Sequence, residues 1–169
     1  MSKKWLPHSY FCLLQAIGYA CTMRVLLQRV LLASVAIAGK EIARCSGPGL
    51  LLFLGILKGD TEKEAQWLAE KIGKLRLWNG DDGSVNRRTI KDIGGGILVV
   101  SQFTLAGDVS DGNRPDYTSA MPPADAEKLY NLFIQKMQST GIPVAAGTFG
   151  AMMEVSLVND GPVTLILER

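Results

Sequence analysis

Two stretches of strand length in this chain are strongly apolar, residues 49–56 and 97–105, and a segment with helical spacing lies between them. The first is apolar at nearly every position, so both of its alternating faces must be covered. A sheet with one face open to water is therefore excluded for this strand. The run predicts a layered fold with a buried central sheet.

The remaining elements are predicted from capping residues, turns and periodicity. Thr61 and Glu64 form a capping-box pattern, with Asp60 as a rival N-cap, and apolar residues then recur at spacings of three and four. A second helix is expected to open at residues 122–123 and to end before Gly141. Further strands are predicted at residues 24–30, 33–37, 41–45, 142–146, 152–158 and 163–167, with a hairpin turn at 38–40.

The order of elements is strands, helix, strand, helix, strands, in a chain whose 169 residues suit one domain. Two helices cannot cover both faces of so much sheet. We therefore expect an α/β fold in a single domain, with sheets on one side and two main helices on the other.

Residues 1–22 differ from the rest of the chain. Lys3 and Lys4 precede a loosely apolar stretch that faintly imitates a signal peptide, but the apolar region is weak and the cleavage site is poor. We interpret residues 1–22 as an extension of unknown role and residues 23–169 as the functional domain.

The domain 23–169 contains one cysteine, Cys45, and no disulfide framework, which indicates a reducing compartment and a cytoplasmic location. The longest apolar run, residues 50–57, is too short to cross a bilayer, so no membrane partner is expected.

Charge offers no general argument for a nucleic-acid partner. The chain has 18 basic and 16 acidic residues, and two basic ones are Lys3 and Lys4, so the domain has 16 − 16 = 0 net charge. Between residues 71 and 91, however, six basic residues form a local cluster, and the only acidic residues in that interval are Asp81 and Asp82. A solvated face and a nucleic-acid contact both remain open for it. The cluster consists of Lys71, Lys74, Arg76, Arg87, Arg88 and Lys91.

The only histidine is His8, which lies in the extension. No Ser-His-Asp or Cys-His pair can form within the domain, and no glycine-rich phosphate loop stands between a strand and a helix. No metal and no cofactor are expected. Hydrolysis by this chain must use carboxylates, water, backbone donors or the substrate itself.

The motif Ser101, Gln102, Phe103 and Thr104 places polar groups at the end of an apolar strand, where scaffolds present chemistry. Thr104 is the nucleophile candidate by residue type, but it is weak without a base. It can instead be a structural strand residue. Alternatively, the backbone N–H groups around Phe103 and Thr104 can form an oxyanion hole.

Asp108 and Asp160 are the carboxylates that could serve Thr104 as a base, although the sequence does not show contact. Gly161 and Pro162 stand between two strand-like runs. They form either a turn between edge strands or a rigid backbone wedge that brings main-chain carbonyls close to a ligand.

Six short stretches occur in order with ordinary spacing, and together they resemble the D-aminoacyl-tRNA deacylases along nearly all of residues 23–169. They lie at residues 28–30, 58–61, 99–105, 112–115, 149–153 and 159–164. The resemblance implies a homodimer with a three-layer β/β/α fold. It also implies hydrolysis of the ester in D-aminoacyl-tRNA and in mischarged glycyl-tRNA, with help from the 2′-hydroxyl of the substrate ribose.

The resemblance also implies roles for individual residues. Gly161 and Pro162 would form a cis peptide that enters the partner subunit's pocket and rejects L-aminoacyl-tRNA, and Arg29 would fix their loop. The pocket would hold the amino acid and ribose against Ser101, Gln102, Phe103 and Thr104. Phe149 and Met153 would form its wall near the adenine, and Ala151 would be a further substrate-binding residue. The alternative is a non-catalytic nucleic-acid-binding module on the same fold.

Overall fold

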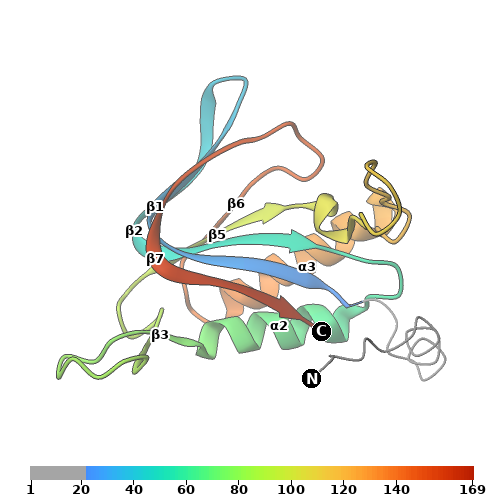
Figure 1. Cartoon of the computed structure of the whole chain (residues 1–169). Helices are drawn as coiled ribbons and strands as arrows, with labels where there is room; N and C mark the ends of the chain where they lie inside the picture. Colours follow the sequence, from blue (N-terminus) through green and yellow to red (C-terminus); the bar gives the residue numbers. More distant parts are fainter. Residues whose placement is uncertain (1–21) are drawn as a thin grey trace, which may run out of the picture.

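The computed structural model describes residues 22–169 and shows one five-stranded sheet with two helices packed on one side (Figure 1). A second, two-stranded sheet is formed by β3 and β4. In chain order the elements are β1 (Arg24–Ile37), β2 (Lys40–Gly55), α2 (Glu62–Lys74), β3 (Arg76–Trp78), β4 (Arg88–Thr89), β5 (Gly96–Ser101), the 3-10 helix η1 (Phe103–Ala106), α3 (Pro123–Ser139), β6 (Val144–Ala146) and β7 (Glu154–Glu168).

The five strands lie in the order β6-β5-β2-β1-β7. β1 pairs antiparallel with β2 and β7, whereas β5 pairs parallel with β2 and β6. The predicted hairpin is confirmed: Ile37 pairs with Lys40 across a two-residue turn. Ala38 and Gly39 both have positive φ, 49° and 75°, as a tight hairpin of this kind requires. The strands predicted at 24–30 and 33–37 are one continuous strand, whose pairing with β2 shifts register between Val30 and Leu32 and again between Val35 and Ala36.

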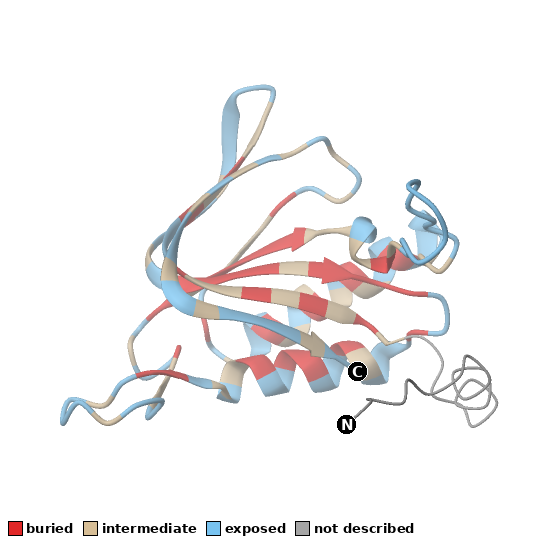
Figure 2. Cartoon of the chain, viewed as in Figure 1, coloured by how far each residue is buried: buried red, intermediate tan, exposed pale blue. Residues whose placement is uncertain are grey.

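The central strands are buried on both faces, as predicted. Leu50 and Leu52 pack in the cluster between the sheet and the helices. Leu51, between them, packs in a second cluster with Ala33 and Val35 from the distal half of β1. The distal halves of β1 and β2 rise away from the helices and bend over the sheet (Figure 1). One folded sheet thus supplies both β layers of the predicted three-layer arrangement, and Figure 2 shows the burial concentrated on its central strands.

Both predicted helices are confirmed. Thr61 is the N-cap of α2, and Glu64 completes the capping box by accepting from the Thr61 N–H at 2.8 Å. α3 opens with Pro123 in its first turn, and Gly141 follows its C-cap with φ of +81°. Neither helix described between residues 22 and 169 has the length and hydropathy needed to cross a membrane.

The last strand differs from the prediction. Residues 152–158 and 163–167 do not form two strands joined by a turn, because β7 runs continuously through Gly161 and Pro162. β7 is an edge strand, and an edge strand tolerates a proline that cannot donate to the ladder. The pairing with β1 shifts register there, between Gln28 and Val30. The small sheet of β3 and β4 was not predicted.

Asp60, the rival N-cap, is instead a buried side chain, 6 % exposed. Its Oδ2 accepts a hydrogen bond from the Leu57 N–H at 2.6 Å, and its Oδ1 has no partner among the residues described. Burial raises the pKa of Asp60 from 3.8 to about 6, and the charge of Glu64 adds to this effect.

We expect Asp60 to reduce folding stability as pH rises. Its folded pKa of about 6 lies above its ordinary value of 3.8, so the stabilisation of its protonated form is complete below pH 3.8 and lost by about pH 6. Asp60→Asn should therefore gain stability relative to wild type across that window, by on the order of 2 kcal/mol. Urea unfolding at several pH values measures the difference, with the exposed Asp111→Asn as control. A pH-independent difference for Asp60→Asn would contradict the assignment.

Candidate active site

A cavity of about 1060 Å³ opens where the central strands end. Its walls come from the β1–β2 hairpin tip, the C-terminal ends of β2 and β5, the start of α3 and the segment before β7. The lining is mostly apolar, and its charged members are Lys58 and Glu154. The residues are Ile37, Ala38, Leu54, Ile56, Lys58, Val100, Ser101, Gln102, Phe103, Ala120, Met121, Pro122, Pro123, Ala126, Phe149, Gly150, Ala151, Met152, Met153, Glu154 and Val155.

The motif at the end of β5 forms one wall of this cavity. The Gln102 N–H donates to the Leu54 carbonyl at 2.8 Å, which extends the pairing of β2 and β5 by one residue. The chain then turns into η1, where the Leu105 N–H donates back to the Gln102 carbonyl at 3.2 Å. Gly55 permits this turn, because a Cβ there would lie 2.7 Å from the Cβ of Leu105. The ends of two buried strands therefore hold the motif in place.

Thr104 lies beside the cavity, not in its lining. Its exposed hydroxyl accepts a hydrogen bond from the Gln102 side-chain amide. Of the two candidate bases, Asp108 accepts from the Ser110 N–H at 2.8 Å, an interaction that holds its pKa below the ordinary value. Asp160 is paired with Arg29 instead. Neither carboxylate is hydrogen-bonded to Thr104 in the part of the chain that the structure describes.

The backbone around Thr104 provides N–H donors, although the Thr104 hydroxyl itself is not activated as a nucleophile. Phe103 and Thr104 are the first two residues of η1. The first N–H groups of a helix have no acceptor within the helix. Two neighbouring N–H groups without a helical acceptor therefore lie at the start of η1, beside the cavity wall.

Phe149 and Met153 also line the cavity, and each packs against residues behind the lining. The ring of Tyr130, from α3, lies 5.7 Å from the ring of Phe149. The Tyr130 hydroxyl is buried 3.1 Å from the carbonyls of both Val99 and Gly147, and burial raises its pKa to about 12. A Cβ on Gly147 would lie 2.6 Å from the Met153 sulfur, so that side chain packs tightly on the glycine backbone.

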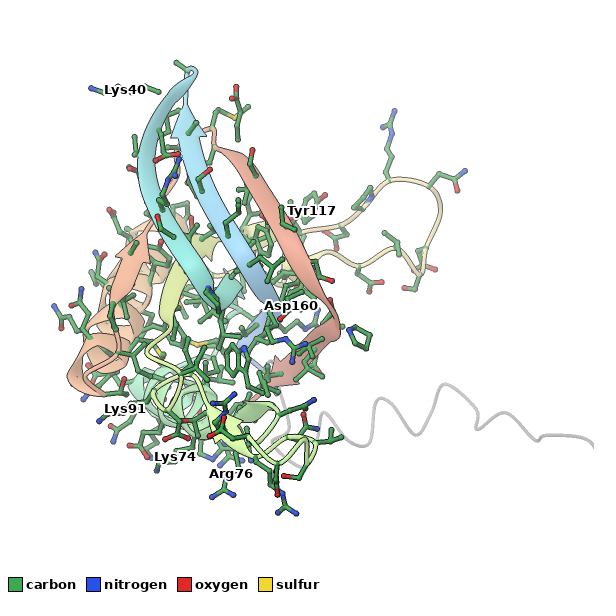
Figure 3. The ribbon with its side chains drawn as sticks, turned by 90° about the vertical axis from the view of Figure 1, so that its left-hand side faces the viewer. Lys40, Lys74, Arg76, Lys91, Tyr117 and Asp160 are labelled. Carbon is green, nitrogen blue, oxygen red and sulfur yellow. The ribbon has the colours of Figure 1, made fainter. Side chains whose placement is uncertain are left out.

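Phe103 of the motif forms an aromatic pair with a residue outside the cavity lining. The exposed ring of Phe103 meets Tyr117 edge-on, with centroids 5.2 Å apart. Tyr117 belongs to the long loop after η1, which is closed by mutual backbone hydrogen bonds of 2.8 Å between Asp108 and Asp116. Figure 3 labels Tyr117 at the base of this loop.

Gly161 and Pro162 do not line the cavity of their own chain. They are exposed on edge strand β7, and the peptide bond between them is cis. Arg29 anchors the segment: its Nε lies 2.8 Å from the Asp160 carboxylate, and its guanidinium also donates to the Gly161 carbonyl at 3.4 Å and to the Leu77 carbonyl. The structure thus brings Ser101, Gln102, Phe103, Phe149, Ala151 and Met153 together and separates Arg29, Gly161 and Pro162 from them.

Sequence reasoning missed several cavity residues. Ile37 and Ala38 come from a hairpin tip far from the other lining residues in sequence, and no local signal marks them. Tyr130, which supports Phe149 from outside the lining, was recognisable only as an aromatic beside the apolar face of its helix. Lys58 stood in one of the quoted motifs, without an assigned role. Within residues 22–169, His, Cys, Asp and Glu side chains form no group of three or more that could hold a metal ion.

Comparison with known proteins assigns the chain to a family. The family model described as D-Tyr-tRNA(Tyr) deacylase matches residues 26–168. A D-aminoacyl-tRNA deacylase of Thermodesulfovibrio yellowstonii is 52% identical over 145 residues, covering 86% of this chain and 98% of that protein. One of Pelobacter propionicus is 49% identical over 147 residues, covering 87% and 100%.

Solved structures agree on the fold. One described as c-Myc DNA Unwinding Element Binding Protein has a TM-score of 0.81 at 40% identity and covers 86% of this chain and 98% of its own. One described as a probable eukaryotic D-amino acid tRNA deacylase has a TM-score of 0.74 at 17% identity and covers 88% and 100%, a likeness that shows the fold alone.

A cavity at strand ends in a single α/β domain, together with these similarities, defines the class of protein: the chain is an enzyme, a hydrolase. It belongs to the D-Tyr-tRNA(Tyr) deacylase family.

We expect Arg29→Gln to lower the free energy of unfolding by about 1–3 kcal/mol, because it leaves Asp160 unpaired and removes the donor to two carbonyls. Arg29→Lys should lose less, since it keeps the charge but lacks the guanidinium fork. Arg44→Gln is the control, because it breaks an exposed ion pair with Glu41, a kind worth about 0–1 kcal/mol. Urea denaturation measures all three, and an Arg29→Gln loss no larger than that of Arg44→Gln would contradict the anchoring role.

Proposed function

We propose that the protein hydrolyses the ester of D-aminoacyl-tRNA and releases the free D-amino acid and tRNA. The observation that carries this proposal is the placement of Ser101, Gln102 and Phe103 on the wall of a roomy, largely apolar cavity, in a chain of this family. Its volume of about 1060 Å³ suits an amino acid together with the terminal adenosine.

The proposed chemistry relies on position and backbone donors. Water attacks the ester carbonyl carbon, and the N–H groups of Phe103 and Thr104 bind the oxyanion that forms. The intermediate collapses by breaking the bond to the ribose oxygen, which takes up a proton. The neighbouring 2′-hydroxyl of the substrate assists the proton transfer, which fits a domain without histidine and with Thr104 away from any candidate base. The protein contributes mainly by orienting the ester.

The cavity residues divide the substrate between them in this proposal. Ser101 and Gln102 contact the amino acid and ribose, with the Gln102 amide held toward Thr104 by their hydrogen bond. Phe149, Ala151 and Met153 receive the adenine on the opposite wall. The support of Phe149 by the buried Tyr130 ring favours a rigid wall on that side.

The shape of a deformable apolar pocket is not enough to reject L-aminoacyl-tRNA. One additional methyl group changes the free energy of binding in such a pocket by only about 1–3 kcal/mol. We propose that Gly161 and Pro162 of a second copy enter the cavity and collide with any L side chain. D residues of many kinds then bind, and so does glycine, which has no side chain to collide. The exposure of this segment outside its own cavity and its anchoring by Arg29 support the proposal.

The same proposal makes the protein a homodimer whose active site is shared between two subunits. Edge strand β7 carries Val158, Leu165 and Ile166, which are 46%, 40% and 73% exposed in the single chain. Large apolar side chains on an edge strand are suited to burial against another protein surface. They support an interface on the side of the molecule that carries Gly161 and Pro162.

We also propose that residues 23–169 form the deacylase domain, with residues 1–22 as an extension of unknown role that lies almost entirely outside the described residues. The match of the family model to residues 26–168 supports this division. A cytoplasmic location fits the tRNA substrate and the free, buried thiol of Cys45.

A nucleic-acid-binding module without turnover is the second candidate. The similarity to the c-Myc DNA Unwinding Element Binding Protein at 40% identity favours it, as does the local basic cluster. The zero net charge of residues 23–169 disfavours it. Binding of nucleic acid with a steep salt dependence and no ester hydrolysis would support this candidate.

The purified protein should release D-tyrosine from D-Tyr-tRNA and glycine from Gly-tRNA while leaving L-Tyr-tRNA intact. Matched D- and L-Tyr-tRNA preparations, with radiolabelled amino acid and a protein-free control, measure the three rates. The wedge predicts discrimination of at least about a thousandfold between the two enantiomers, more than the roughly 10–200-fold that a soft pocket supplies. Inert protein would refute the deacylase proposal, and equal rates would refute the wedge.

Thr104→Ala should keep most of the activity, with kcat lowered by less than about tenfold, because no base activates this hydroxyl. Loss of a true nucleophile costs roughly 10⁶ in kcat in a serine hydrolase. Thr118→Ala, on the exposed loop, is the matched control, and circular dichroism checks the fold. A Thr104→Ala variant that is folded but inactive would return Thr104 to the role of nucleophile.

A further inference from the structure

The basic cluster Lys71, Lys74, Arg76, Arg87, Arg88 and Lys91 has no role in the site described above. It gathers where α2 ends and the β3–β4 sheet begins, and Figure 3 shows Lys74, Arg76 and Lys91 at one end of the molecule. In a domain of zero net charge this is a local concentration of positive charge.

Half of the cluster already has partners. Lys74 lies 3.7 Å from Glu70, Arg88 lies 2.9 Å from Asp81, and Lys91 donates to a backbone carbonyl at 3.5 Å. Lys71, Arg76 and Arg87 are exposed and form no ion pair within 4 Å among residues 22–169. Three cations therefore remain available to a ligand.

The helix dipole accounts for only part of this charge. Lys71 and Lys74 lie in the last turn of α2, where cations stabilise the negative end of the helix. Arg76 follows the helix on β3, and Arg87 directly precedes β4. Neither arginine is on the helix, so stabilisation of the helix does not explain their presence. Substituting these two arginines therefore tests ligand binding without changing the charge of the helix end.

The cluster is remote from the cavity of its own chain. Pro123 at the start of α3 lines the cavity, whereas Lys91 donates to the carbonyl of Thr140 at the other end of that helix. α3 has 17 residues, and at a rise of about 1.5 Å per residue it is about 25 Å long. A ligand in that cavity would meet the cluster only if it spanned the whole helix.

The cluster is close, however, to Gly161. The guanidinium of Arg29 donates both to the Gly161 carbonyl, at 3.4 Å, and to the carbonyl of Leu77, which is the neighbour of Arg76 on β3. The Arg29 guanidinium also lies 6.0 Å from the ring of Trp78, the last residue of β3. The side chain of Arg29 thus connects the β3–β4 sheet to the Gly161–Pro162 segment, and the two lie on the same side of the molecule.

We propose that the basic cluster of one subunit binds the phosphate backbone of the tRNA whose 3′ end occupies the partner's cavity. The inference rests on the proposed function, in which Gly161 and Pro162 enter that cavity. When this segment enters the partner's cavity, Arg76 and Arg87 on the same side of the molecule come to the mouth of that cavity. The strand leading to the terminal adenosine carries a phosphate at every nucleotide, and exposed arginines bind phosphate oxygens with paired N–H donors.

The test compares two substrates and two double variants. Arg76→Gln/Arg87→Gln removes two free charges of the cluster, and Arg44→Gln/Lys128→Gln removes two exposed charges elsewhere. Each is assayed on D-Tyr-tRNA and on D-tyrosyl-adenosine, an ester without phosphates, over 50 to 300 mM KCl, conditions that span the screening range.

The Arg76/Arg87 variant should lose about tenfold in kcat/KM on D-Tyr-tRNA at low salt, with a salt slope shallower by about 1.5. Its rate on D-tyrosyl-adenosine should stay within about twofold of wild type, as should both rates of the control variant. Lys71→Gln, on the exposed face of α2, is the second variant if the first fails to fold. Its salt slope should fall by about 0.8.

Two failures are distinguishable. An active wild type with the same tRNA rate and salt slope in the Arg76/Arg87 and Arg44/Lys128 variants would overturn this inference alone. A wild type inert on both esters would overturn the proposed function, and this inference with it.

Discussion

Burial of the central strands on both faces is the constraint on which the rest of the structure depends. Leu50 and Leu52 face the helices, and Leu51 faces away from them. With both helices on one side, the second face can be covered only by the sheet itself, so β1 and β2 must be long enough to bend over it. Their hairpin tip then reaches the cavity, where Ile37 and Ala38 complete the wall. The cavity is thus a by-product of covering the second face.

The chemistry available in that cavity follows from the ends of β2 and β5, which lie in its wall. Strand ends expose backbone donors, and η1 begins at Phe103 with N–H groups that no helical carbonyl accepts. The cavity lining is mostly apolar, with Lys58 and Glu154 as its charged members, and the hydroxyl of Thr104 is hydrogen-bonded to an amide, not to a base. Such a site suits a reaction whose substrate carries its own proton-transfer group beside the bond to be broken.

The sequence was most informative where physical signals are local. The capping box at Thr61, the apolar run 49–56 and Gly141 after α3 each depend on neighbours within a few residues, and all agree with the structure. The placement of Gly161 and Pro162 inside a strand could not be read locally, because it depends on β7 lying at a sheet edge.

The candidate site likewise contains residues that local motifs identify and residues that only long-range contacts place. The residues 101–103 and 149–153 were identified from motifs, and the structure brings them to one cavity. Tyr130 supports Phe149 through a contact across the fold, and the link from Arg29 to Leu77 joins elements 48 positions apart. Contacts at such separations leave no periodic trace in a single sequence.

The separation of the cavity from Gly161 and Pro162 on one chain has a genetic consequence under the proposed dimer. Each active site is then assembled from two polypeptides, one giving the walls and the other the wedge. In a cell with two alleles, a lesion at Gly161 impairs the neighbour's site and spares its own, while a lesion at Phe149 does the reverse. Mixed dimers of two such defective chains contain one intact site, so the alleles complement each other although neither alone gives a complete site.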